Sequence, residues 1–182
     1  MSVALRVFSV PATGSSRLTF AEAVRAYQDD VFGVALRITG DRDAALDVTS
    51  TTFLKAFRAF DRYDPSRPLR PWLLRIATNE ATSHARSHAR ELRRRAALEG
   101  AAELPDRAAT PDERSLLRES RREIRDAVAA LPDPYRAVVV LRYFNDLSID
   151  EIAAVTGRNA STVAVQLLRA RAMLRRSLAE RR

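Results

Sequence analysis

The chain has 182 residues, 46% of them apolar, which is enough for one ordinary domain or two small ones with packed cores. It contains no cysteine, which excludes disulfides, cysteine-based zinc sites and cysteine nucleophiles. Its 31 basic residues outnumber 23 acidic ones, and the net charge of +8 favours a polyanionic partner, either nucleic acid or an anionic membrane surface.

The N-terminal extension, residues 1–17, is broken by Pro11 and Gly14. No run in the chain approaches the roughly 18 apolar residues of a membrane span. We therefore expect no targeting segment and no membrane insertion. The expected location is the cytoplasm.

Two helices are expected next. Thr19 and Glu22 have the spacing of a capping box, in which each side chain satisfies the other's free backbone N–H, and Gly40 should end this first helix. A second helix is predicted from about Asp43 to Phe60. The helix carries three phenylalanine rings on one face, Phe53, Phe57 and Phe60. This spacing predicts that all three rings pack in the core.

A loop rich in proline follows, over residues 61–71, because Pro65, Pro68 and Pro71 remove backbone donors and restrict the chain. A third helix should run from near Trp72 to about Arg95. Six of its polar residues fall within about 80° of helical arc, as expected of a surface that follows a nucleic-acid backbone. They are Arg75, Asn79, Thr82, Arg86, Arg90 and Arg93. A solvated helix face is the alternative.

Residues 96–111 lack apolar periodicity and are predicted to be a flexible linker between residues 18–95 and residues 112–182. The run Thr110–Glu113 has the features of a helix start, with proline at the first helical position. The apolar face of that helix is predicted to consist of Leu117, Ile124, Val128 and Leu131. Asp133 and Pro134 should cap the next helix, which continues to Phe144.

The clearest local signal is residues 147–174, LSIDEIAAVTGRNASTVAVQLLRARAML. Ser148 and Glu151 should cap a short helix that ends at Gly157, and a second helix then turns Val163 and Leu167 inward. This is the helix-turn-helix pattern, whose second helix enters the DNA major groove. The predicted fold is therefore all-α, with two small helical domains joined by a flexible linker, the C-terminal one a helix-turn-helix. An ordinary helical hairpin is the alternative for this segment.

Catalysis and cofactors are not expected. His84 and His88 have the i, i+4 spacing of a metal pair, but the chain has no further histidine and no glutamate between them in the metalloprotease pattern. It also has no glycine-rich phosphate loop and no nucleophile elbow. We predict no catalytic residue, no metal and no cofactor.

Two stretches together resemble a known family. Residues 32–60 with RPWLLRIATN resemble region 2 of the extracytoplasmic-function (ECF) group of bacterial sigma factors, and residues 131–171 resemble their region 4. The resemblance implies a transcription initiation factor that binds core RNA polymerase and promoter DNA, and that an anti-sigma factor can inhibit. It implies polymerase docking by Asp43, Asp47, Ser50, Thr51 and Leu54.

The resemblance also implies two promoter contacts. Minus-10 recognition, with capture of a flipped base, is expected of Tyr63, Asp64, Ser66, Arg67, Trp72, Arg75, Asn79 and Arg86. Helical geometry places Thr162, Val165, Gln166 and Arg169 on the exposed face of the second helix, with Ser161 nearby. Minus-35 recognition is expected of these five residues and of Arg171. Trp72 has a core role as its alternative.

The chain departs from the family's common pattern at two places. Ala164 and Gln166 stand where basic residues are usual, and glutamine pairs well with adenine, which predicts an A/T component in the minus-35 element. Ser50 and Thr51 replace the usual Gln-Glu pair in the docking helix. One hypothesis is that a Ser/Thr kinase phosphorylates Thr51 and restores the negative charge. The alternative is that neutral hydrogen bonds replace it.

Two other functions remain open at this level. A self-sufficient helix-turn-helix repressor would bind duplex DNA tightly alone, with twofold half-site spacing. A structural or interaction protein that binds RNA nonspecifically is the other possibility.

Overall fold

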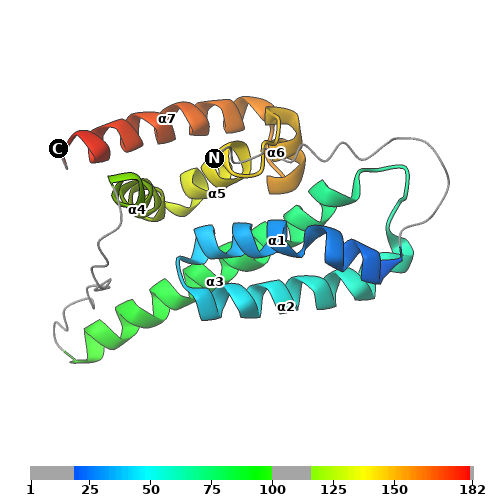
Figure 1. Ribbon diagram of the computed structural model, residues 1–182. Coiled ribbons are helices and arrows are strands. Elements are labelled where there is room, and N and C mark those ends of the chain that lie inside the picture. The colour runs from blue at the N-terminus through cyan, green and yellow to red at the C-terminus, as the bar shows by residue number, and fades with distance from the viewer. Residues whose placement is uncertain (1–18, 100–115, 181–182) are drawn as a thin grey trace.

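The structure is a computed structural model that describes residues 19–99 and 116–180. The N-terminal module contains α1 (Phe20–Thr39), α2 (Arg42–Ala59), the short 3-10 helix η1 (Phe60–Arg62) and α3 (Leu69–Glu99). The C-terminal module contains α4 (Leu116–Ala129), α5 (Asp133–Tyr143), α6 (Ile149–Thr156) and α7 (Ala160–Ala179). The two modules lie one above the other in Figure 1. No strand occurs in the two described ranges, and the all-α prediction is confirmed.

Some predictions fall outside those ranges. They concern the N-terminal extension, most of the linker and the helix start at residues 110–113. Within the described part of the chain, no helix has the length and apolar content needed to cross a bilayer.

The predicted helix ends are confirmed where the sequence carries a complete signal. Both predicted capping boxes are present, Thr19 with Glu22 and Ser148 with Glu151. In each, the hydroxyl accepts a bond from the glutamate backbone N–H, and the glutamate carboxylate accepts one from the backbone N–H of the capping residue. The hydrogen bonds from Thr19 lower the pKa of the Glu22 carboxyl. Gly40 and Gly157 close their helices with φ of 72° and 67°, the left-handed region that favours glycine.

Two helix starts differ from the prediction. Helix α3 begins at Leu69, ahead of Pro71. A proline is tolerated in the first helical turn because the backbone N–H groups of that turn have no partner within the helix, so the missing N–H costs no hydrogen bond. The residue that caps α5 is Pro132, without a side-chain bond, and Asp133 is the first residue of the helix itself.

The core of the N-terminal module joins α1 to α3. Val31, Val34 and Ile38 from α1 and Leu73 and Leu74 from α3 are all at most 1% exposed. Burial of each such side chain stabilises the fold by about 1.5–3 kcal/mol relative to exposure.

An aromatic cluster closes one end of this core. Phe20 stands at its centre, in edge contact with Phe53, Phe57 and Phe60 at centroid distances of 6.4, 5.2 and 5.3 Å. The prediction of core packing for Phe53, Phe57 and Phe60 was wrong for Phe57, which is 62% exposed. Phe57 lies on the outer edge of the face, where Phe20 is its ring partner.

The C-terminal module packs α6 and α7 as predicted. Ile152, Val155 and Val163 are at most 1% exposed, and Leu167 is 6% exposed. The predicted apolar face of α4 is only partly buried, because Val128 and Leu131 are buried but Ile124 is 44% exposed. The side chain of Leu117 lies outside the described residues.

The two modules share one core. Buried residues of both form a single hydrophobic cluster, and α3 packs on α6 while α1 packs on α5. Among the described residues, four arginines make contacts across the seam between the modules. Arg70 donates to the Asn145 carbonyl at 2.8 Å, and Arg136 to the Ile38 carbonyl at 2.7 Å. Arg86 pairs with Asp133 at 3.5 Å, and Arg37 lies 4.4 Å above the Phe144 ring.

Candidate nucleic-acid interface

Helix α7 presents a compact polar face to solvent. Asn159 caps the helix and accepts hydrogen bonds from the Thr162 backbone and the Ser161 hydroxyl, so the first turn is fixed. Ser161, Thr162, Val165 and Arg169 are exposed, while Val163 and Leu167 hold the opposite face in the core. Such a face on the second helix of a helix-turn-helix has the position of a major-groove reader.

Gln166 differs from its neighbours on this face. It is half-buried, and its Oε1 accepts a hydrogen bond of 2.9 Å from Arg158 Nη1. Arg158 lies in the turn between the two helices and is also bonded to the Pro134 carbonyl. The amide of Gln166 is therefore held in one orientation in this structure.

Arg171 lies apart from the other residues predicted for minus-35 recognition. It is exposed but lines a cavity of about 240 Å³ with Arg142, Tyr143 and Ile149, on another side of α7. The structure thus brings four of the six predicted residues onto one exposed face, with Gln166 at its edge and Arg171 outside it.

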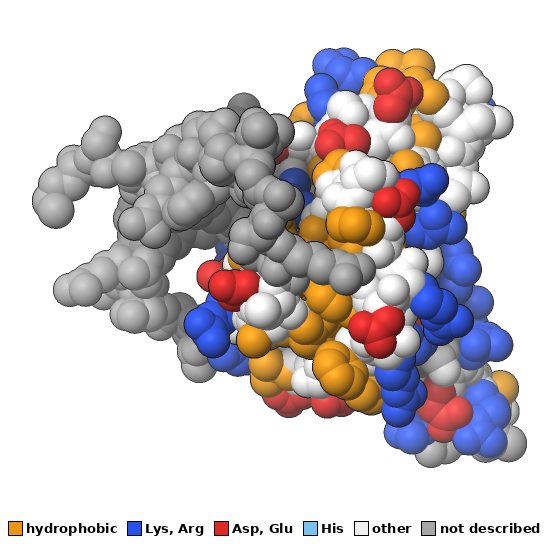
Figure 2. Space-filling model, turned by 90° about the vertical axis from the view of Figure 1, so that its right-hand side faces the viewer, with side chains coloured by type: hydrophobic (Ala, Val, Ile, Leu, Met, Phe, Trp, Pro, Cys, Tyr) orange, Lys and Arg blue, Asp and Glu red, His pale blue; other side chains and the backbone are white. Residues whose placement is uncertain are grey.

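The polar stripe of α3 is present as predicted. Arg75, Asn79, Arg86, Arg90 and Arg93 are exposed, and Thr82 is half-buried. Part of this stripe faces the C-terminal module, since Asn79 and Arg86 line a cavity at the seam. Figure 2 shows basic side chains gathered along one edge of the face drawn, beside an apolar centre.

The loop before α3 has a defined shape. Asp64 accepts bonds from the backbone and the hydroxyl of Ser66, at 3.0 and 2.7 Å, and lies 3.4 Å from Arg67. The hydrogen bonds from Ser66 lower the pKa of the Asp64 carboxyl. The Tyr63 hydroxyl donates to the Arg67 carbonyl, which closes the turn. A loop ordered before binding loses less entropy when it receives a ligand.

The rings beside this loop form a half-buried stack. Tyr63 is stacked on Phe60 at 6.1 Å and contacts Trp72 at 5.0 Å. Burial raises the pKa of the Tyr63 hydroxyl. Trp72 packs against the core but stays half-buried beside the loop.

Helix α2 carries the second candidate surface, an acidic and apolar face. Asp43, Asp47 and Ser50 are exposed, and Leu54 is 50% exposed. Leu46 and Phe57, at 46% and 62% exposure, extend the same face. Thr51 lies at the edge of this face and is half-buried, whereas Thr52 is buried in the core.

Several residues of these surfaces were not predicted. Leu46 and Phe57 were recognisable from their spacing with Leu54 on α2. Arg70 bonds Asn145, Asp133 pairs with Arg86, and Arg158 bonds Pro134. These partners are distant in the sequence, and no local pattern signals such contacts. His84 and His88 are both exposed, and no group of three potential metal ligands lies together in the part of the chain that the structure describes.

Family comparisons match both modules. Residues 23–91 match the model for sigma-70 region 2, and residues 121–174 match that for sigma-70 region 4. The chain belongs to the sigma-70 family, in its ECF group. It is a sigma factor of promoter-directed transcription, which decides against the repressor and RNA-binding alternatives.

Curated relatives align over most of the chain. The ECF sigma factor SigW of Bacillus subtilis is 28% identical over 87% of this chain and 88% of its own. SigE of Mycolicibacterium smegmatis is 32% identical over 96% of this chain and 67% of its own. The sigma-E factor of Streptomyces avermitilis is 32% identical over 90% of this chain and 87% of its own.

Solved structures share the fold. RpoE in complex with the anti-sigma factor NepR, from Bartonella quintana, superposes with a TM-score of 0.72 at 23% identity, over 90% of this chain and 98% of that one. CnrH in complex with the cytosolic domain of CnrY gives a TM-score of 0.65 at 25% identity, over 88% of each chain.

Proposed function

We propose that this sigma factor docks on core RNA polymerase through the exposed face of α2 and reads two promoter elements, one with each module. The loop before α3, together with the α3 stripe, contacts the minus-10 element. The exposed face of α7 contacts the minus-35 element. Through these contacts the factor directs promoter recognition, DNA melting and initiation.

The observation that carries this proposal is the acidic and apolar face of α2. Leu46, Leu54 and Phe57 are large apolar side chains turned to solvent on a helix whose other side builds the core. Contiguous exposed apolar side chains rimmed by charge mark protein interaction sites. Asp43 and Asp47 supply that charge, so we expect a partner surface that is apolar with basic residues around it.

DNA contacts follow from the charge and shape of the other surfaces. Three arginines at regular intervals on α3, Arg86, Arg90 and Arg93, are exposed and can contact successive phosphates. Extruding a base costs a few kcal/mol. The ordered loop of residues 63–67 and the ring of Trp72 beside it are suited to offset that cost by stacking.

Reconstitution tests this function directly. The purified chain should co-purify with core polymerase, and sequencing of the DNA retained by the complex should return a shared pair of elements. The chain alone should bind the same DNA weakly. Tight binding of the chain alone to a twofold-symmetric site, without polymerase, would contradict the proposal.

Replacing Gln166 with alanine is expected to weaken minus-35 discrimination by about 1–3 kcal/mol, the value of a good bidentate base contact. Because Arg158 holds the Gln166 amide at 2.9 Å, base contact requires that bond to be shared or broken. Discrimination is measured as the affinity ratio between promoter variants with holoenzyme.

Arg171→Ala is the matched variant for this measurement. If Arg171 contacts phosphate, the variant should weaken binding to all sequences alike and reduce the slope of log affinity against log salt. An unchanged salt slope would remove that role, and unchanged discrimination in Gln166→Ala would remove the base contact.

We also propose that phosphorylation of the hydroxyl run on α2, at Thr51, regulates docking. A phosphate adds a charge of about −1.5 to −2 and three acceptor oxygens. The side chains of the run differ in accessibility, with Ser50 exposed, Thr51 half-buried and Thr52 buried. Modification of Thr51 therefore requires a kinase that reaches the edge of the face, and Ser50 is the competing acceptor.

Thr51→Glu is expected to bind core polymerase more tightly than unmodified wild type, by roughly tenfold or more if one charge-assisted hydrogen bond is gained. Thr51→Ala should bind no more tightly than unmodified wild type. Ser50→Glu tests the competing acceptor, and intact-mass analysis of protein from its native host tests the modification itself. Full-strength binding by unmodified wild type, with neither Glu variant tighter, would show that no such switch exists.

Two further assignments belong to this proposal. The structural neighbour RpoE was solved in complex with the anti-sigma factor NepR. We propose that an anti-sigma factor also binds this chain, over its docking and DNA surfaces. We place the protein in the cytoplasm, where its proposed partners, core polymerase and the promoter, are found. We assign it no enzymatic activity, since its proposed role is carried entirely by binding surfaces.

A further inference from the structure

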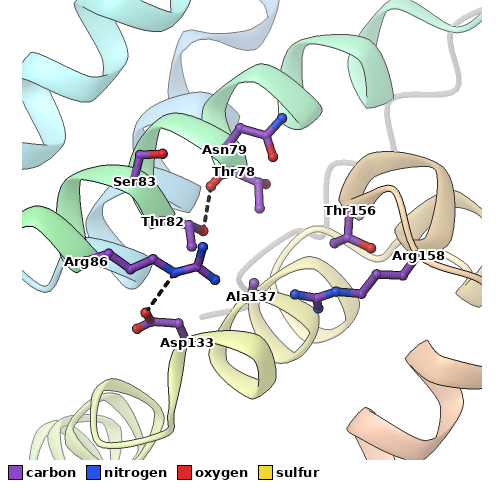
Figure 3. Close-up of a pocket in the computed structure, with 9 residues that line it drawn as sticks. All are labelled: Thr78, Asn79, Thr82, Ser83, Arg86, Asp133, Ala137, Thr156 and Arg158. Carbon is purple, nitrogen blue, oxygen red and sulfur yellow. Dashed lines mark hydrogen bonds and ion pairs between the residues drawn. The ribbon is translucent and has the colours of Figure 1, made fainter.

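A polar cavity of about 250 Å³ lies in the seam between the modules. Helix α3 forms one wall, and the other comes from α5, α6 and the turn before α7 (Figure 3). The lining residues are mostly hydroxyl, amide or charged, and they include Thr78, Thr82, Arg86, Asp133, Thr156 and Arg158. None of the residues proposed to contact polymerase or the minus-35 element lines this cavity, although Arg158, which does, also holds the Gln166 amide.

Two arginines from opposite modules meet in it. Figure 3 shows the guanidinium groups of Arg86 and Arg158 pointing toward one another over Ala137. Asp133, 3.5 Å from Arg86, offsets one of the two positive charges, so these three residues leave a net charge of +1. Like charges that face one another across a partly enclosed space repel, and an anion between them removes that cost.

Both arginines keep donors for such an anion. The contacts of Arg86 with described residues involve Nε, and those of Arg158 involve Nη1. Each guanidinium carries five N–H donors in a planar fork. The remaining donors of each fork have no acceptor among the described residues.

A buried hydroxyl provides the second, independent observation. Thr78 is 3% exposed and lines the cavity, yet its Oγ1 has no hydrogen-bond partner among the described residues. A buried polar group without a partner is rare and costs stability. The neighbouring hydroxyls differ, since Thr82 and Thr156 each donate to a carbonyl of their own helix, at 2.7 Å. The Thr78 Oγ1 is closed to solvent in this arrangement, so the side chain must rotate for its hydroxyl to find an acceptor in a ligand oxygen in the cavity.

We propose that this cavity binds a small phosphate-bearing anion, held by Arg86 and Arg158 from the two modules and by the Thr78 hydroxyl. Guanidinium forks and hydroxyl donors match the geometry of phosphate oxygens. Because the ligand would contact both walls, binding would stabilise the packed arrangement of the modules. Its consequence for transcription rests on the proposed function, since Asn79 and Arg86 also belong to the proposed minus-10 surface.

Thermal unfolding with inorganic phosphate tests binding without polymerase or DNA. The midpoint of the full chain should rise by roughly 3–6 °C at near-saturating phosphate, relative to chloride at equal ionic strength. Thr78→Val, which keeps the shape and removes the hydroxyl, should lose more than half of that rise. It should not lower the midpoint in chloride, because it removes an unpaired buried group.

Thr52→Val is the matched control. Thr52 is also a fully buried threonine with an unpaired Oγ1, but it lies on α2 and does not line the cavity. It should keep the full phosphate-dependent rise, whereas Arg158→Ala should lose most of it.

Equal rises in the wild type and all three variants would show general anion binding to a basic protein and overturn the proposal, as would no rise at all. A short single-stranded oligonucleotide separates the two sources of phosphate. A Thr78-dependent rise with the oligonucleotide but not with inorganic phosphate would assign the residues to DNA binding and overturn a small-anion site. Polymerase binding, measured separately, tests the proposed function regardless of this result.

Discussion

Leu54→Glu is expected to abolish complex formation with core polymerase. Leu54 is half exposed at the centre of the α2 face, between Asp47 and Phe57, so it would be buried at the heart of the docking contact. Loss of such an anchor costs about 2–4 kcal/mol, and an unpaired carboxylate left in an apolar contact adds to that cost. The affinity should therefore fall by at least roughly 100-fold, measured by fluorescence anisotropy of labelled sigma factor against core polymerase.

The fold should not change in this variant. The side chain faces solvent, and glutamate is as good a helix former as leucine, so far-UV circular dichroism and the unfolding midpoint should match the wild type. Leu54→Met is the matched control, since it keeps an apolar side chain of similar volume and should retain binding. Full-strength binding by Leu54→Glu would show that another surface docks on polymerase.

The features that could be predicted from sequence are those with local causes. Thr19 with Glu22 and Ser148 with Glu151 set helix starts through bonds spanning three residues, and Gly40 and Gly157 end helices by adopting positive φ. The helix-turn-helix followed from these signals and the inward spacing of Val163 and Leu167. The start of α3 was misplaced because a proline was treated as ending the loop, although Pro71 is tolerated in the first helical turn.

The arrangement of the modules could not be predicted. Arg136 and its acceptor Ile38 are 98 residues apart, and Arg70 and Asn145 are 75 apart, and no periodicity links residues at such distances. The same applies to the candidate sites. Asn79 and Gln166 were proposed as DNA contacts from their helical positions, but the cavity at the seam and the bond from Arg158 depend on tertiary packing.

The contact made by Arg136 leads to the second prediction. Its guanidinium donates twice to the Leu131 carbonyl, from Nε at 3.2 Å and from Nη2 at 2.9 Å, and across the seam to the Ile38 carbonyl at 2.7 Å. Burial lowers the pKa of Arg136, which is the expected cost of placing the charge in the seam. One side chain therefore joins the end of α1, the α4–α5 turn and α5 itself.

Arg136→Met is expected to lower the free energy of unfolding by about 2–4 kcal/mol, because it leaves two carbonyls without their charged donor. The unfolding midpoint should fall by roughly 4–16 °C in calorimetry. The wild type should unfold in one transition, since the buried residues of both modules form a single cluster. In the variant, the two modules should begin to unfold separately.

Arg142→Met is the control, because Arg142 Nη1 donates only within the C-terminal module, to the Leu147 carbonyl at 2.9 Å. It should cost less and keep a single transition. Since the chain lacks cysteine, dyes on Ser87→Cys and Ala172→Cys, both exposed, report the distance between the modules without further changes. Energy transfer should fall in Arg136→Met and stay unchanged in Arg142→Met. A loss of stability in Arg136→Met with a single transition and unchanged transfer would mean that this arginine stabilises its own module and that the apolar core alone holds the seam.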